Sequence, residues 1–136
     1  MGPLSTDVFF YGLFMDAAVL EAKGISRTRG RPGVVRNWAL RIGNRATLIP
    51  DPGRAVHGVL MTLPLPDLDR LYAETSVQMY RPVAVLVEAR GTVVPALAYV
   101  LPERPLPEER NPEYAATLRA LAERLGLPAE YTRSIA

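Results

Sequence analysis

The chain has 136 residues, of which 49% are hydrophobic and 22% charged, and its formal net charge is +2. This length and balance are typical of a globular protein, so we expect residues 1–136 to form a single domain. The absence of cysteine and the presence of one histidine exclude disulfides, cysteine nucleophiles, thiolate zinc sites and multi-histidine metal sites. No run has the length of a membrane span and the N-terminus lacks a secretory-signal pattern, so we expect a cytoplasmic protein.

The first predicted elements are a buried strand over Val8–Tyr11 and a short helix that Asp16 caps and Gly24 ends. Gly12 lies in the turn between them and lets a ligand approach the backbone closely, while the start of a helix adds partial positive charge. Tyr11–Met15 therefore predicts a cradle of N–H groups for an anion or a carbonyl oxygen. An ordinary strand-to-helix connection would have the same pattern.

Four strand-like runs follow, separated by glycine, asparagine or proline: Gly33–Val35, Trp38–Ile42, Ala46–Ile49 and Val56–Met61. We expect them to be neighbours in one antiparallel or mixed sheet that has one face exposed to solvent. His57 lies in the last run without a Ser or Asp partner nearby in sequence, which favours a sheet-face residue over a catalytic one.

Positive charge is concentrated between Ala22 and Pro66, which enclose Lys23 and seven arginines, Arg27 to Arg54, against Asp51 alone. We call this stretch the basic segment. Such a segment could attract RNA or an anionic metabolite. However, it contains one aromatic residue, Trp38, and so lacks the stacking platforms that single strands need. Nucleic-acid binding is therefore not favoured.

The second half predicts a helix, a hairpin and terminal helices. Pro64 and Pro66 precede a helical apolar face that ends near Tyr72, and Met79–Glu88 and Val93–Tyr99 predict two strands joined at Arg90-Gly91. A charged, proline-rich connector between Pro102 and Pro112 could be a linker or a lid. The last long helix is capped by Asn111, ended by Gly126 and followed by a helical turn after Pro128, with an apolar stripe of Tyr114, Leu118, Leu121 and Leu125.

These elements do not alternate as a doubly wound fold requires, so the sequence indicates an α+β domain built on a curled sheet or small barrel. The chain contains no Gly-x-Ser-x-Gly elbow, no phosphate-binding loop and no dinucleotide turn. Nucleophile triads and nucleotide cofactors are therefore poorly supported, and we expect no cofactor.

Glu74 differs from the other acidic residues because apolar elements flank it: the helix ending at Tyr72 and the strand Val83–Val87. A carboxylate at such a junction would be partly desolvated, which suits it to exchange a proton near neutral pH. A helix-end glutamate pointing into water is the alternative. An N–H cradle and one proton shuttle suffice for intramolecular aminolysis, in which a tethered α-amino group attacks its own γ-amide carbonyl.

Several motifs together resemble the γ-glutamylcyclotransferase-like superfamily, which includes AIG2-like and butirosin-tailoring members. The resemblance covers nearly the whole chain. Its hallmark is a strand ending in Tyr-Gly-Ser, which Phe10–Met15 matches in place. The other segments that resemble the family are Ala46–Leu48, Val56–Leu60, Leu68–Glu74, Met79–Val83 and Leu127-Pro128 with Tyr131.

The resemblance implies a small mixed β-barrel flanked by helices, a small-molecule γ-glutamyl substrate and release of 5-oxoproline without a cofactor. It implies Glu74 as the general acid/base and Tyr80 as a wall or hydrogen-bond donor. The implied substrate-binding residues are Tyr11, Gly12, Leu13, Phe14 and Met15. Leu13 replaces the usual serine and Thr75 the usual glycine, so a less polar substrate or an altered loop is expected. A binding protein that keeps the cavity without turnover is the alternative.

Overall fold

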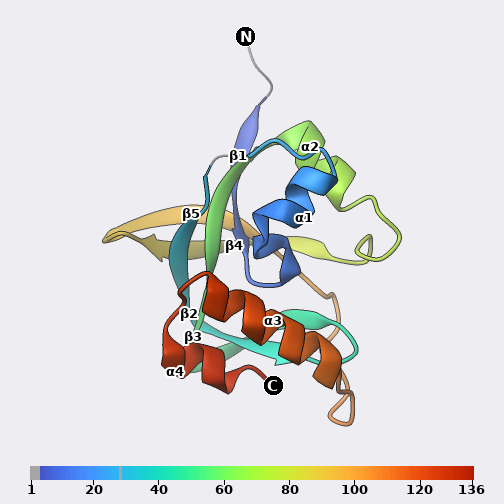
Figure 1. The fold of residues 1–136 in the computed structure, drawn as a ribbon, viewed down its shortest axis with the longest axis vertical. Helices are drawn as coiled ribbons and strands as arrows, with labels where there is room; N and C mark the ends of the chain where they lie inside the picture. The colour runs from blue at the N-terminus through green and yellow to red at the C-terminus, as the bar shows by residue number, and fades with distance from the viewer. Residues whose placement is uncertain (1–3, 28) are drawn as a thin grey trace.

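The computed structural model describes residues 4–27 and 29–136, and Figure 1 shows its elements. Its strands form a closed barrel in the order β1-β3-β2-β4-β5, with antiparallel neighbours and a parallel contact between β1 and β5 at Val8 and Leu97. This confirms the expected α+β fold with a small mixed barrel. The strands are β1 (Ser5–Phe10), β2 (Arg31–Ile42), β3 (Ala46–Pro64), β4 (Arg81–Ala89) and β5 (Thr92–Val100).

The four expected strand runs between residues 33 and 61 are parts of only two long strands, so their expected separation is wrong. β2 and β3 pair along their length, with an irregularity between Arg36 and Trp38. There Asn37 has a φ of 69° and its side chain accepts a hydrogen bond from the Gly53 amide at 3.2 Å. The polar and glycine residues that suggested chain breaks instead form a bulge, which bends a strand pair without ending it.

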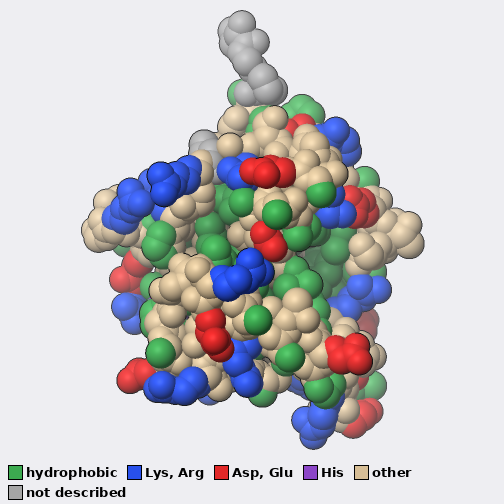
Figure 2. Space-filling model, in the orientation of Figure 1, with side chains coloured by type: hydrophobic (Ala, Val, Ile, Leu, Met, Phe, Trp, Pro, Cys, Tyr) green, Lys and Arg blue, Asp and Glu red, His purple; other side chains and the backbone are tan. Residues whose placement is uncertain are grey.

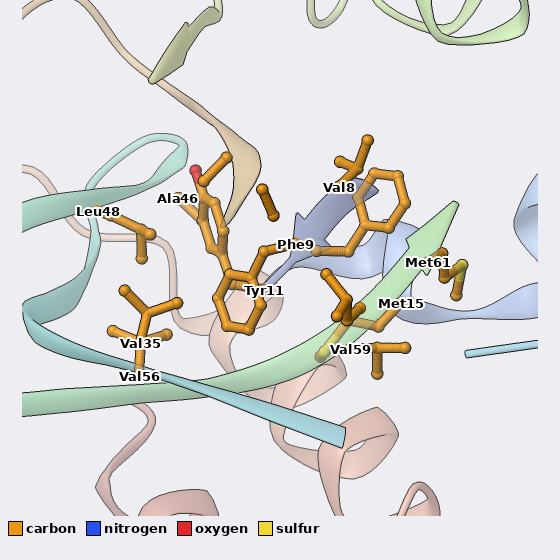
Figure 3. Packing of buried hydrophobic residues seen from close by; sticks show 14 of the residues in the cluster. Val8, Phe9, Tyr11, Met15, Val35, Ala46, Leu48, Val56, Val59 and Met61 are labelled. Atoms are coloured by element: carbon orange, nitrogen blue, oxygen red, sulfur yellow. The ribbon is translucent and has the colours of Figure 1, made fainter. Parts of the chain in front are cut away.

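Gly58 lets β1 approach β3 closely. A Cβ at this position would lie 2.3 Å from the carbonyl oxygen of Phe10 and 2.7 Å from the Phe9 ring. The Phe9 side chain is fully buried, and Figure 3 shows side chains of β1, β2 and β3 packed together around it. A glycine is therefore required here for space, and the strand that carries the Tyr-Gly turn is anchored in the core.

The helices are α1 (Ala17–Ala22), α2 (Leu65–Leu71), α3 (Pro112–Arg124) and α4 (Ala129–Ser134), with a 3-10 turn η1 (Leu13–Met15) before α1. Figure 1 shows α1 and α2 towards one end of the molecule and α3 and α4 towards the other. Both expected caps are confirmed: Asp16 accepts from the Ala18 amide at 3.0 Å and Asn111 from the Tyr114 amide at 3.1 Å. None of the helices described in residues 4–27 and 29–136 is long and apolar enough to cross a membrane.

Two expected boundaries differ in the structure. β4 begins at Arg81, so Met79 and Tyr80 belong to the preceding turn. In α3, Leu125 does not extend the buried stripe, because it is 43% exposed. The chain turns at Gly126, whose φ is 78°, and returns the side chain of Leu127 to the core instead. The buried positions of α3 are Ala115, Leu118, Leu121 and Ala122.

Candidate functional site

A cavity of about 410 Å³ brings the Tyr-Gly turn and Glu74 together. We call it the aromatic pocket. It is lined by six of the seven residues expected at the site: Tyr11, Gly12, Leu13, Phe14, Glu74 and Tyr80. Met15 does not line it, because this last residue of η1 turns inward and is buried in the core. The other lining residues are Phe9, Phe10, Lys23, Asn44, Arg45, Ala46, Tyr72, Ser76, Val77, Tyr99, Asn111 and Tyr114.

The Tyr-Gly turn is short and tightly closed. Amides of Met15 and Asp16 donate to the carbonyls of Gly12 and Leu13 at 3.0 and 3.1 Å. The amides at the start of such a turn have no carbonyl acceptor within the turn itself. The expected cradle is therefore a single 3-10 turn facing the pocket, followed by α1, rather than the start of a continuous helix.

Tyr114 of α3 closes one side of this turn, a contact that sequence reasoning missed. A Cβ added at Gly12 would lie 2.7 Å from its hydroxyl oxygen, the single atom it would meet within 4 Å outside its chain neighbours. The φ of Gly12 is −113°, an ordinary value for any residue. Gly12 is therefore required for the space that the Tyr114 hydroxyl occupies and not for an unusual backbone angle.

Aromatic rings form much of the wall. Tyr72 and Tyr99 stack with ring centroids 3.8 Å apart and an interplanar angle of 8°, and the Phe14 ring meets Tyr72 edge-on at 5.8 Å. Tyr11 donates its hydroxyl to the Tyr99 carbonyl and Tyr80 donates to the Ala46 carbonyl, each at 2.5 Å. The Tyr80 hydroxyl is thus already engaged with the backbone, which makes Tyr80 a wall residue in this structure.

Burial keeps these phenols neutral. It raises the pKa of Tyr80 to about 12, and it also raises the pKa values of Tyr72 and Tyr11, with the neighbouring tyrosines acting in the same direction. The pocket wall therefore presents neutral aromatic faces over the physiological pH range. Its charged side chains come from other residues.

Glu74 supplies the carboxylate of the pocket. It follows α2 in a series of turns, in which the Val77 amide donates to the Glu74 carbonyl at 3.0 Å. Its side chain is 40% exposed, and its two oxygens lie 2.9 and 2.7 Å from Nζ of Lys23. The carboxylate is therefore only partly shielded from water, and a cation faces it directly.

Lys23 is the clearest functional residue that sequence reasoning missed, since it was counted there only in the basic segment. It is the C-cap residue of α1, and its amide donates to the carbonyls of Glu21 and Leu20. Because Asp16 both ends η1 and caps α1, the Tyr-Gly turn and Lys23 belong to one continuous unit. No local pattern could indicate the partner of Lys23, which lies 51 residues away.

The β2–β3 turn and the proline-rich connector form a further side of the pocket. Arg41 donates to the carbonyls of Leu106 and Glu109 at 2.8 and 3.2 Å, and Asn111 donates to the Asn44 carbonyl at 3.2 Å. Amides of Leu106 and Asn44 donate to the Glu109 carboxylate and lower its pKa. In this structure the connector is thus fastened to the β2–β3 turn.

His57 lies away from the pocket, in agreement with the expected sheet-face position. It pairs with Val34 in the β2–β3 ladder, and its ring centroid is 4.9 Å from that of Tyr131 in α4. Burial and the charge of Arg36 lower its pKa. Its neighbours therefore favour a neutral, structural imidazole.

Comparison with known folds returns closely similar structures at low sequence identity. A structure described as a gamma-glutamyl cyclotransferase matches with a TM-score of 0.80 at 21% identity, covering 97% of this chain and 86% of that one. YkqA from Bacillus subtilis matches with a TM-score of 0.77 at 26% identity, covering 95% of this chain and 52% of YkqA. An AIG2-like protein from Mus musculus matches with a TM-score of 0.58 at 20% identity, covering 91% and 84%.

Among curated proteins, no relative matches this chain. The family model described as gamma-glutamyl cyclotransferase, AIG2-like, matches residues 8–120. This range contains the Tyr-Gly turn, Lys23, Glu74, nearly all of the barrel and most of α3. The chain therefore belongs to the gamma-glutamyl cyclotransferase, AIG2-like family.

Proposed function

We propose that this protein cyclises a γ-glutamyl amide or peptide to 5-oxoproline and releases the amine, with Glu74 as the general acid/base. The observation that carries the proposal is the shared cavity. The Glu74 carboxylate and the Tyr11–Phe14 segment line the same pocket, although they come from opposite sides of the basic segment. Family membership supports the reaction class, since gamma-glutamyl cyclotransferases give the family its description.

The proposed reaction moves two protons from the α-nitrogen of the substrate to the departing nitrogen and needs no external nucleophile. The Glu74 carboxylate removes a proton from the α-ammonium group of the substrate, and the freed lone pair forms a bond to the γ-carbonyl carbon. The bond from this carbon to the departing nitrogen then breaks as Glu74 returns that proton to the nitrogen. The ring nitrogen passes its second proton through Glu74 to the released amine, which leaves as an ammonium ion. One C–N bond forms and one breaks, and no water or redox partner is consumed.

The Tyr-Gly turn and the aromatic wall each have a role in this reaction. Gly12, Leu13 and Phe14 line the pocket, so amides of this turn can donate to the γ-carbonyl oxygen as negative charge develops there, which is worth about 3 kcal/mol per donor in comparable sites. The Leu13 amide now bonds the Tyr114 hydroxyl, which the substrate would have to displace for that amide to serve. The aromatic wall of Phe14, Tyr72 and Tyr99 can hold the substrate folded, so that its amine and carbonyl meet. Leu13 adds apolar rather than hydroxyl surface, which favours a substrate that is apolar on that side.

The first experiment is a screen of γ-glutamyl amines, γ-glutamyl dipeptides and glutathione for 5-oxoproline release. A substrate that turns over then serves to compare the wild type with Glu74→Gln, which keeps the side-chain size but cannot exchange the proton. Turnover should fall by about 100- to 10,000-fold, while the thermal unfolding midpoint and the affinity for 5-oxoproline change little.

Glu88→Gln is the matched control for this variant. The Glu88 side chain is 42% exposed and paired with Arg36, compared with 40% exposure and a Lys23 partner for Glu74, but it does not line the aromatic pocket. Its turnover should stay within about twofold of the wild type, because it does not contact the substrate. Residual activity of the same size in Glu74→Gln would remove Glu74 from the proposed role.

The second candidate function is a binding protein that keeps the pocket without turnover. It is favoured by Leu13, which stands where the family motif has serine, and by the Tyr114 hydroxyl, which already lies beside Gly12. Saturable binding of 5-oxoproline by the wild type, with no amine released from any compound in the screen, would establish it. Release of 5-oxoproline at a rate that Glu74→Gln abolishes would exclude it.

A further inference from the structure

We infer that Lys23 recognises the α-carboxylate of the substrate, so that the Lys23–Glu74 pair together reads an α-amino acid head group. This inference rests on the proposed function for the identity of the substrate. It assigns the selectivity for a free α-carboxylate to one side chain, and it starts from the two contacts of 2.9 and 2.7 Å between Nζ of Lys23 and the Glu74 oxygens.

The first step concerns what the substrate must do to Glu74. For Glu74 to take a proton from the α-ammonium group, that group must reach the carboxylate oxygens that Lys23 now holds. The Lys23 side chain is only 29% exposed, so its ammonium would be left partly desolvated when Glu74 turns to the substrate. A cation left in that state is costly unless an anion takes the place of Glu74.

The second step concerns which anion is available. In a γ-glutamyl compound the α-ammonium and the α-carboxylate are attached to the same carbon. When the ammonium reaches Glu74, the α-carboxylate of the substrate is therefore brought close to the Lys23–Glu74 ion pair. Lys23 has a flexible four-carbon stem and can follow it by changing rotamer. Each of these four charges, two of the protein and two of the substrate, then lies next to a charge of the opposite sign.

Arg45 is the rival cation, because it also lines the pocket. Its guanidinium donates to the Ser76 carbonyl at 2.6 Å, on the side of the β2–β3 turn. Lys23 is favoured because it already touches Glu74, the group that must receive the neighbouring ammonium. Two cations in one pocket nevertheless require an experiment that separates them.

The experiment compares two versions of a substrate found in the screen: the γ-glutamyl compound and its counterpart with a neutral α-carboxamide. Amine release is measured for both. The wild type should prefer the carboxylate by about 10- to 100-fold in kcat/KM, the usual strength of a hydrogen bond to a charged group. In Lys23→Met this preference should fall to within about threefold, mainly through a higher KM for the carboxylate. Lys23→Arg should restore most of it.

Arg45→Met is the matched control and should keep the carboxylate preference. If Arg45→Met loses the preference and Lys23→Met keeps it, the inference is wrong and Arg45 recognises the carboxylate. If Lys23→Met lowers kcat/KM equally for both substrates, Lys23 only positions Glu74, and the inference is again overturned.

A binding arm separates this inference from the proposed function. Binding of 5-oxoproline and of its neutral amide is measured by calorimetry on the wild type and on Lys23→Met. If no compound is turned over but 5-oxoproline binds more tightly than its amide through Lys23, the recognition stands and the catalytic proposal fails. If turnover is seen and neither kcat/KM nor binding depends on Lys23, the catalytic proposal stands and the recognition fails. If no compound is turned over and neither ligand binds, both fail.

Discussion

Among the residues that the structure describes, two hollows of similar size are built in opposite ways. The aromatic pocket has a volume of about 410 Å³, and a second hollow of about 350 Å³ lies near the start of β2. We call the second one the arginine hollow, because it is lined by Arg29, Arg31 and Arg90, together with Gly30, Leu60 and Thr62. The first combines neutral aromatic walls with a cation and a carboxylate in contact, whereas the second offers charge of a single sign.

This difference teaches that charge concentrated in sequence need not form a site. The cations of the basic segment are dispersed over helix and barrel: Arg27 pairs with Glu21 of α1, and Arg36 pairs with Glu88 of β4. Figure 2 shows lysine and arginine side chains scattered over the visible face and interspersed with acidic ones. Proton transfer needs opposed groups at fixed distances, and within the part of the chain that the structure describes the aromatic pocket supplies them.

After Glu74→Gln, the largest expected effect comes from Gly12→Ala, which tests whether the pocket depends on the fit between the Tyr-Gly turn and Tyr114. The new methyl group would overlap the Tyr114 hydroxyl, so the turn, the Tyr114 side chain or α3 must shift. Turnover should fall by about 100-fold, the usual cost of a shift of about 1 Å at a reacting centre. Overpacking should also lower the free energy of unfolding by about 1–3 kcal/mol, measured by urea denaturation.

A second substitution makes this prediction specific. Tyr114→Phe removes the one atom that the new methyl group meets, so the double variant Gly12→Ala with Tyr114→Phe should regain most of the stability and part of the turnover. If the double variant is no better than Gly12→Ala, the fit to the Tyr114 hydroxyl is not the reason that a glycine is needed here. Tyr114→Phe by itself serves as the control for removal of the hydroxyl.

The next effect in size is alkaline unfolding, which tests whether the aromatic wall is closed to water. Burial raises the pKa of Tyr80 to about 12, above the value of 10.0 for an exposed tyrosine, and the pKa values of Tyr11 and Tyr72 are raised as well. The folded state therefore holds these protons more tightly than the unfolded state. The stabilising contribution of Tyr80 is complete below about pH 10 and is lost as the pH rises through about 12, and the contributions of Tyr11 and Tyr72 are likewise complete below about pH 10.

The measurement is the urea midpoint at about pH 8, 10 and 11, together with tyrosinate absorbance. The midpoint should stay nearly constant to about pH 10 and fall above it, and tyrosinate should form together with unfolding. Tyrosinate that appears in full while the fold is intact would show that water reaches the wall, and the contrast between the two hollows would then lose its physical basis.

Much of the fold and the pairing of the Tyr-Gly turn with Glu74 could be predicted from the sequence. The caps Asp16 and Asn111 act within a few residues of themselves, and the hairpin at Arg90-Gly91 needs only local turn chemistry, with φ values of 49° and 78°. Glu74 could be placed opposite the turn only through the resemblance to a known family.

The rest could not be predicted, because it depends on contacts between distant parts of the chain. Lys23 meets Glu74 across 51 residues and Tyr11 meets Tyr99 across 88, and no periodicity encodes such pairs. The bulge at Asn37 was mistaken for a chain break for a different reason: glycine, proline and asparagine mark a bend in a strand pair as readily as its end.

A smaller effect is expected from Tyr80→Phe and Tyr11→Phe, which test whether these hydroxyls act on the structure or on the substrate. Each removes a hydrogen bond of 2.5 Å to a backbone carbonyl, of Ala46 or Tyr99, and leaves that carbonyl without its partner. Stability should fall by about 1–2 kcal/mol, while kcat changes less than about threefold. A fall in kcat above about 100-fold with unchanged stability would instead assign the hydroxyl to the substrate.

The smallest effect is expected at the arginine hollow, from a triple variant with Arg29→Gln, Arg31→Gln and Arg90→Asn. Asparagine is chosen for the last position because it tolerates the φ of 49° found there. Turnover should stay within about twofold of the wild type, because these guanidiniums do not line the aromatic pocket.

A second measurement tests whether the arginine hollow is itself a binding site. Binding of a short single-stranded RNA is measured against salt concentration for the wild type and for this triple variant. Each phosphate that a guanidinium neutralises steepens the logarithmic salt slope by about 0.7 for a single strand. Tight wild-type binding with a steep slope that the variant flattens by this amount for each arginine removed would make the arginine hollow a second site. Weak binding that the variant leaves unchanged would mean that the two hollows differ in function as they do in charge.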